Sequence, residues 1–250
     1  MKLRPWLVLL AFVLPSVSHA RAFDLKNERV APFIRGTFGY CLAGTTAFGG
    51  SSGADITFDK SANFATGGEF GVVVEGPSLG MRISVEYLIP KQLTSAEGKD
   101  QAGATQFSME SKMGVLIPQV NFDFNMKTTN VSRYFVGGGV GMATLTLENQ
   151  FTQSAGSSYS ALGNFTENGT GSTVGGQVYA GYETHFTDTV SISFDVGYRY
   201  YNVTTINSTK SQTSFTGSQV EGQPLKNHDG TDRQVNLSGP YGALGFRFYL

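Results

Sequence analysis

The stretch VSISFDVGYRYY, residues 190–201, alternates between two kinds of side chain. One set is apolar or aromatic from Val190 to Tyr200, and the interleaved set includes Asp195 and Arg199. Successive side chains of a β-strand point to opposite faces, so this stretch predicts a strand with one apolar and one polar face. The fold therefore depends on which of these two faces meets water.

The same period of two recurs in seven further segments. With the first, the expected strands lie at about 34–42, 65–75, 81–89, 110–126, 133–147, 174–186, 190–201 and 234–250. Two segments are irregular. Pro118 predicts a bulge or an edge-like position in the fourth. The triplet Gly137 to Gly139 in the fifth predicts room for bulky side chains from neighbouring strands.

The connections between these segments alternate in length. Three are short, at about 76–80, 127–132 and 187–189, and four are long and polar, at about 43–64, 90–108, 148–172 and 202–233. Transmembrane barrels combine short periplasmic turns with long extracellular loops. The pattern predicts an all-β fold, a transmembrane antiparallel up-and-down β-barrel of eight strands, with both termini in the periplasm.

Composition favours the same fold. Charged residues make up 15% of the chain, against roughly 25% in ordinary soluble domains. After the N-terminal segment, no apolar stretch reaches the roughly 20 residues of a membrane helix, and a closed barrel is the other way to cross lipid. The strands of a lipocalin-like barrel or a β-sandwich would also alternate apolar and polar residues. In those folds the apolar face points inward, and its many aromatic side chains would overfill a small interior. The net charge of −1 argues against nucleic acid as a partner.

The N-terminus has the order charged, apolar, small. Lys2 and Arg4 precede an apolar run at 6–14 and a small-residue region at 15–22, which is typical of a cleavable secretory signal. Cleavage after Ala20 and after Ala22 both fit. We therefore expect a signal peptide at 1–22, a barrel domain at 23–250, and export to the outer membrane of a Gram-negative bacterium.

Three segments resemble a known superfamily. RYFVGGGVGMA at 133–143, and VYAGYETHFTD at 178–188 followed by GYRY at 197–200, resemble strands of the OmpA transmembrane-domain and Opa-like superfamily. The final GFRFYL at 245–250 resembles the C-terminal signal read by the barrel assembly machinery, with Leu in place of the usual Phe. The resemblance implies an assembly signal at Phe246, Phe248 and Leu250, and a surface-antigen type of barrel without the peptidoglycan-binding domain.

The polar face of the strands carries charges of both signs. We interpret them as a lumen charge network of ion pairs rather than as acid–base catalysts, because positive and negative groups are nearly balanced. Its predicted members are Arg35, Glu69, Arg82, Glu86, Asp123, Glu183, Asp195, Arg199 and Arg247.

Signals for chemistry are weak elsewhere. The string His185-Phe-Thr187 falls at a predicted periplasmic turn, and His228-Asp229 is interpreted as a solvated turn. Cys41 is the single cysteine and there are three histidines, so we predict no metal site and no cofactor.

Aromatic side chains are expected at both membrane interfaces. Phe33, Tyr134, Phe186 and Phe248 are assigned to the periplasmic belt, and Tyr40, Tyr87 and either Tyr198 or Tyr200 to the outer belt.

These observations lead to one main functional hypothesis and two alternatives. The main hypothesis is an integral outer-membrane barrel with exposed loops and a structural, envelope or adhesion-type role, without catalysis. The first alternative is a small porin or an OmpW-like conduit, which charged rather than apolar lumen residues disfavour. The second is a lipid A-modifying enzyme. The expected partners are outer-membrane lipid and lipopolysaccharide, the barrel assembly machinery, and host or environmental ligands reached by the loops.

Overall fold

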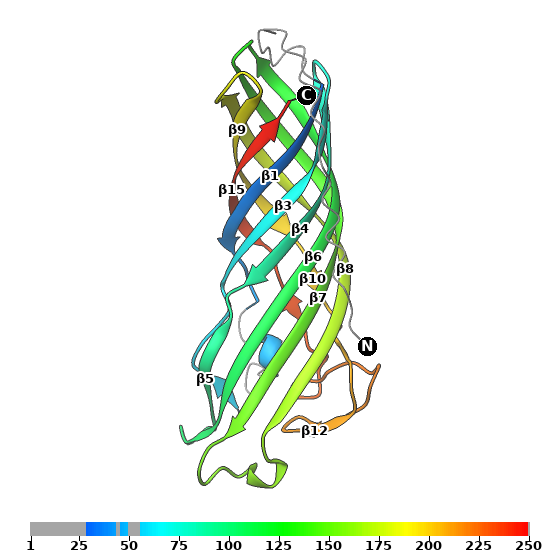
Figure 1. The fold of residues 1–250 in the computed structure, drawn as a ribbon. Coiled ribbons are helices and arrows are strands. Elements are labelled where there is room, and N and C mark those ends of the chain that lie inside the picture. The colour runs from blue at the N-terminus through cyan, green and yellow to red at the C-terminus, as the bar shows by residue number, and fades with distance from the viewer. Residues whose placement is uncertain (1–28, 44–45, 50–55, 250) are drawn as a thin grey trace, which may run out of the picture.

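The computed structural model describes residues 29–43, 46–49 and 56–249, which form a long barrel (Figure 1). The predicted signal peptide at 1–22 and the terminal Leu250 lie outside the described residues. Among the helices of the described ranges, none is both long and apolar enough to cross a membrane.

Eight antiparallel strands form the barrel wall. They are β1 (Val30–Tyr40), β3 (Phe64–Glu75), β4 (Leu79–Pro90), β6 (Thr105–Thr128), β7 (Ser132–Gln153), β8 (Phe165–His185), β9 (Val190–Tyr200) and β15 (Gly239–Phe248). Each pairs with the next, and β15 pairs with β1 from Phe33 opposite Arg247 to Gly39 opposite Tyr241. The predicted fold, an eight-stranded antiparallel barrel, is confirmed.

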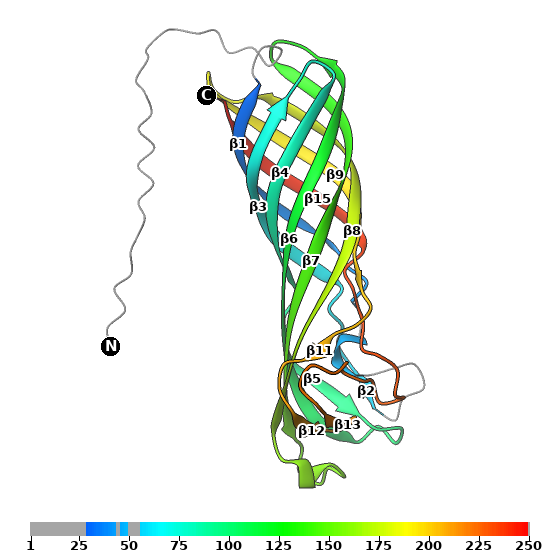
Figure 2. The ribbon, with the colours of Figure 1, turned by 90° about the vertical axis from the view of Figure 1, so that its right-hand side faces the viewer.

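Shorter elements gather at one end of the barrel. They are η1 (Thr46–Phe48), β2 (Thr57–Phe58), β5 (Leu93–Lys99), η2 (Ser160–Leu162), β10 (Asn202–Val203), β11 (Asn207–Ser208), β12 (Gln212–Ser214), β13 (Gly217–Gln219) and β14 (Val235–Asn236). Figure 2 places β2, β5, β12 and β13 at the lower end, opposite the C-terminus. The short turns and the C-terminus share the upper end, as the alternation of connection lengths predicts.

Two of the predicted long loops contain long strand segments, whereas the other two contain only strands of two or three residues. β6, β7 and β8 span 24, 22 and 21 residues, so they run far past the 11-residue β1 and β9. This contradicts the loop assignments at 90–108 and 148–172. Inward-facing Phe107 and Phe151 alternate there with polar residues, and the polar set suggested a solvated loop. We call this projecting sheet, with β5, β2 and β11 at its sides, the extension.

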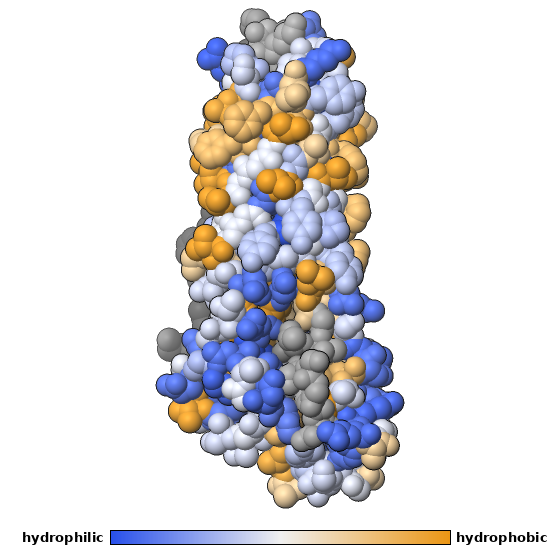
Figure 3. All heavy atoms as spheres, turned by 180° about the vertical axis from the view of Figure 1, so that it is seen from behind, coloured by the Kyte–Doolittle hydropathy of each residue, from blue (hydrophilic) through white to orange (hydrophobic). Residues whose placement is uncertain are grey.

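The two faces of the wall differ in polarity, as β1 illustrates. Ile34 is 56% exposed on the outside, while its neighbour Arg35 is 4% exposed and faces the interior. Figure 3 shows apolar side chains gathered around the upper part of the barrel and hydrophilic ones around the lower part. The barrel therefore carries an apolar band outside and polar groups inside, the reverse of a soluble protein.

Two local predictions differ from the structure. The bulge expected as one alternative at Pro118 is absent: Pro118 lies opposite Val85, and pairing with β7 resumes at Gln119 in the register held at Leu116. The β6–β7 pairing omits Ile117 and Pro118, so on that side Pro118 takes the other alternative, an edge-like position. The register shift occurs between Asn125 and Lys127 instead.

Phe33 does not join the periplasmic belt. It is 6% exposed and packs inside with Ala31, Val73 and Tyr249, because it lies two residues from Arg35 and so shares its face. The other seven aromatic residues considered for the belts are exposed on the outer face, as expected. They are Tyr40, Tyr87, Tyr134, Phe186, Tyr198, Tyr200 and Phe248.

The glycine triplet on β7 makes room for side chains in the lumen. A Cβ at Gly137 would lie 2.4 Å from the Tyr179 ring, and one at Gly139 would lie 2.1 Å from the side-chain oxygen of Asn121. Tyr179 is buried and its hydroxyl donates to Asp123 at 2.6 Å, so the ring has little freedom to move away. This is the role predicted for the triplet.

We therefore expect Gly137→Ala to lower the free energy of unfolding by about 1–3 kcal/mol, the usual cost of overpacking. The matched control is Gly36→Ala on β1, where an added Cβ meets nothing within 4 Å. Denaturant unfolding of both variants in detergent micelles measures the difference. Equal stability of the two variants would contradict the packing assigned to Tyr179.

Candidate functional site

The lumen contains two layers of different chemistry. Charged and polar side chains fill the part near the short turns, and an apolar cluster fills the part near the extension. Both layers consist of buried side chains, so the candidate site is the closed interior of the barrel.

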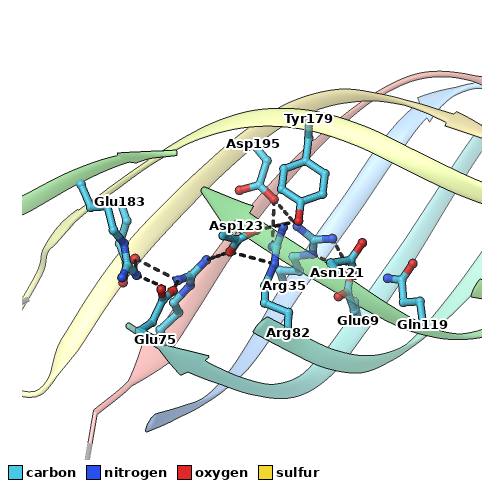
Figure 4. A network of polar contacts seen from close by, with 12 residues as sticks. Arg35, Glu69, Glu75, Arg82, Gln119, Asn121, Asp123, Tyr179, Glu183 and Asp195 are labelled. Carbon is cyan, nitrogen blue, oxygen red and sulfur yellow. Dashed lines mark hydrogen bonds and ion pairs between the residues drawn. The ribbon is translucent and has the colours of Figure 1, made fainter. Parts of the chain in front are cut away.

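Figure 4 shows the centre of the charged layer, where Asp195 joins two arginines. Arg35 forms an ion pair with Asp195 and another with Glu69 at 2.5 Å. Arg82 lies 3.2 Å from Asp195 and 3.2 Å from Asp123. The guanidinium of Arg82 also lies 4.4 Å from the centre of the Tyr179 ring. A planar guanidinium suits this place because its several donors can bridge two carboxylates at once.

A second cluster lies nearer the turns and contains Glu75, Arg133, Glu183 and Arg247. Arg247 pairs with Glu75 at 2.7 Å and with Glu183 at 3.0 Å. Arg133 pairs with Glu75 at 2.9 Å and also with Glu183. Arg247 further lies 3.5 Å from Asp123, which links this cluster to the central one.

A third cluster lies on the side facing the extension. Arg199 pairs with Glu86 at 3.1 Å, and the Thr37 hydroxyl donates to the same carboxylate at 2.7 Å. The guanidinium of Arg199 lies 4.5 Å from the centre of the Tyr241 ring. Every charge in this cluster therefore has an opposite charge or an aromatic face beside it.

All nine residues assigned to the network from the sequence are buried and take part in these contacts. Sequence reasoning missed Glu75 and Arg133, which complete the cluster near the turns. The alternation of the strands could have identified both residues. Arg133 lies on the same strand face as Phe135, and Glu75 lies on the same face of β3 as Glu69.

The expectation of charged rather than apolar lumen residues holds for only one of the two layers. Met113, Val115 and Ile117 point inward from β6 and belong to a large buried cluster. Aromatic rings close its far end: Phe107 lies 4.9 Å from Phe215 and 5.4 Å from Phe151, measured between ring centres. The alternation of polar and apolar residues is hard to recognise from Met113 to Pro118 because the inward-facing residues change from polar to apolar there.

The long connections fill this apolar layer and are held by buried polar contacts. Arg233 forms a fully buried ion pair with Glu167 on β8, and Gln219 on β13 donates to the same carboxylate. The Asn149 side chain donates to the carbonyl of Ala47 at 3.0 Å. These contacts fix the connections before β2 and before β14 against the inner face of the extension.

The remaining predicted residues lie apart from these layers. Phe246 and Phe248 face outward on β15, and Leu250 lies outside the described residues. His228 stacks on Phe215, and Asp229 accepts a hydrogen bond from the Thr231 hydroxyl at 2.6 Å, within a turn. The described part of the chain contains no cluster of His, Cys, Asp and Glu placed to hold a metal ion.

The strand ring defines the class: a small, eight-stranded, antiparallel barrel. No family model matches the chain, and no curated protein matches it.

Solved structures similar to the chain include Neisserial surface protein A, with 10% identity, 88% of this chain and 97% of that chain covered, and a TM-score of 0.39. A major outer membrane protein from Thermus thermophilus has 13% identity, 88% and 99% coverage and a TM-score of 0.48. The attachment invasion locus protein Ail of Yersinia pestis has 11% identity, 89% and 99% coverage and a TM-score of 0.43.

The ion pairs predict a sharp response to losing one arginine. In Arg82→Ala, Asp123 would keep only Arg247 at 3.5 Å as a cationic partner. We expect a loss of about 3–5 kcal/mol in the free energy of unfolding, the usual cost of leaving a buried charge without its partner. Guanidinium unfolding from lipid vesicles measures it, with the exposed Lys127→Ala as control. A change no larger than that of the control would refute the role assigned to Arg82.

Proposed function

We propose that this protein is an integral outer-membrane β-barrel with a closed lumen. In this proposal it carries its extension on the outside of the cell and has a structural, envelope or adhesion-type role without catalysis.

One observation carries the proposal: the polarity of the barrel wall is inverted. Phe70, Ile83, Phe124 and Val178 are each more than half exposed on the outside, whereas Arg82 and Asp195 are buried within. In water, so much exposed apolar surface would be unfavourable at roughly 25 cal/mol per Å². A hydrocarbon surrounding removes this cost, and the closed strand ring leaves no unpaired wall edge in it.

The closed lumen favours a structural role over a porin. Eight strands enclose a space just wide enough for side chains. Here that space holds paired charges near the turns and the apolar cluster near the extension. An apolar lumen could suit a hydrophobic conduit, but this apolar layer is filled by side chains. Phe48 and Phe215 from the connections occupy it, which disfavours the conduit alternative.

The extension is the part that a partner would reach first. Its outer face is rich in Thr, Asn and Gln, and buried contacts hold its connections on a rigid sheet. Binding residues commonly lie on loops carried by such a scaffold. The proposed partners are outer-membrane lipid and lipopolysaccharide around the wall, and host or environmental ligands at the extension. The barrel assembly machinery is the proposed reader of Phe246, Phe248 and Leu250.

Membrane integration can be tested on gels. Unheated samples in dodecyl sulfate should migrate differently from boiled ones, because a closed ring of strands has no edge from which to unravel. The boiled sample is the unfolded control. Identical migration, combined with solubility in buffer without detergent, would refute the membrane proposal.

The closed lumen predicts no steady ionic current. In a planar bilayer, the purified protein should give no reproducible single-channel steps, while a large open porin measured in the same chamber gives them. Steady conductance of uniform size from the wild-type protein would overturn the closed lumen and favour the porin alternative.

A further inference from the structure

A hollow of about 350 Å³ lies on the outer face of the wall, where the barrel passes into the extension. We call it the rim groove. The residues that line it and matter here are Tyr87, Lys112, Gly114, Thr146, Glu148 and Thr170. These six residues lie on the outer face of the wall, and none of them belongs to the charged layer or to the apolar layer of the lumen.

Strand register fixes the depth of the rim groove. Gly114, Thr146 and Thr170 lie opposite one another on β6, β7 and β8 and form its floor. Four residues toward the turns along β7 from Thr146, Met142 lies opposite Val174, and both are exposed apolar side chains. The groove therefore begins just beyond the apolar band, at the level that lipid headgroups occupy if the extension lies outside the cell.

The groove combines an aromatic wall with a polar floor. Gly114 has no side chain, and a Cβ there would lie 2.5 Å from the Tyr87 hydroxyl, so Tyr87 extends over this position. The Thr146 hydroxyl donates to the carbonyl of Gly114 at 3.2 Å, and the Thr170 hydroxyl donates to that of Leu145 at 3.0 Å. Both hydroxyl oxygens keep lone pairs with which to accept further hydrogen bonds.

An exposed pair of opposite charges closes the water-facing side of the groove. Lys112 Nζ lies 3.9 Å from Glu148 Oε1, and the two side chains are 54% and 40% exposed. The distance and exposure make this a weak ion pair, so Lys112 can turn to a ligand at little cost. Glu148 Oε1 also accepts a hydrogen bond from Gln150 Nε2 at 2.6 Å, which holds its carboxylate at the edge of the groove. Glu148 accepts hydrogen bonds, and Lys112 offers a cation of the kind that binds phosphate.

We propose that the rim groove binds the phosphorylated sugar headgroup of an outer-leaflet glycolipid. The apolar face of a sugar ring packs on Tyr87, its hydroxyls donate to Thr146, Thr170 and Glu148, and its phosphate pairs with Lys112. This inference rests on the proposed function, because only a barrel with its extension outside the cell brings the groove to that leaflet. Its volume is in the range of small-ligand sites.

The test uses the purified, detergent-folded full chain and calorimetric titration with a deacylated, phosphorylated core oligosaccharide. Gly114→Leu fills the floor and should weaken binding at least tenfold; the Tyr87 hydroxyl that it meets is the free end of a flexible side chain. Lys112→Gln should weaken binding of the phosphorylated probe and leave binding of the dephosphorylated probe unchanged. The control is Lys99→Gln, which removes another exposed, ion-paired lysine outside the groove and should bind as the wild type does.

Three results would overturn the sugar site: no binding by the wild type, equal binding by Gly114→Leu, or displacement of the oligosaccharide by an equal concentration of inorganic phosphate. Equal binding of a neutral glycan without phosphate would also overturn the glycolipid assignment. Gel migration of the same samples separates this inference from the proposed function. A barrel that is heat-modifiable yet does not bind refutes the groove alone, whereas a chain that is not heat-modifiable refutes the membrane proposal.

Discussion

Every backbone N–H and C=O group of the wall strands needs a partner, and the structure depends on this constraint. The pairing of β15 with β1 meets it by removing the two edges that an open sheet would leave. Once the ring is closed, alternate side chains must point either to the outer surface or into the lumen. The period of two in the chain is the consequence of this geometry.

Closure at eight strands also explains why the lumen needs arginine. The interior is narrow, so a charged group there loses its water and must find compensation from other side chains. Arg35, Arg82 and Arg247 each contact more than one carboxylate, which satisfies several donors of a single cation. Such a network contributes little net stability compared with apolar packing, but removing one member is costly. It fills the lumen with groups that hold one another in place.

Polarity changes along the barrel axis. Around the charged layer, apolar residues face outward and charges face inward, whereas in the extension Phe107 and Phe151 face inward and polar residues face outward. The extension is thus organised like a soluble sheet that uses the connections as its second layer, with Phe48 and Phe215 packed on it. The rim groove lies at the level where one arrangement gives way to the other, which explains why a tyrosine and a lysine meet there.

Much of this organisation follows from the sequence alone. Alternation determines which residues share a face, so the eight strands and the burial of Arg82, Asp195 and Arg247 could be read from it. Tertiary structure decided the rest, because alternation does not say which surroundings each face meets. Register across β7 and β8 brings Arg133 opposite Glu183, and folding of a distant connection brings Phe215 onto Phe107. The extension looked like loop because its apolar face is covered by chain segments far away in sequence, which only the folded molecule brings together.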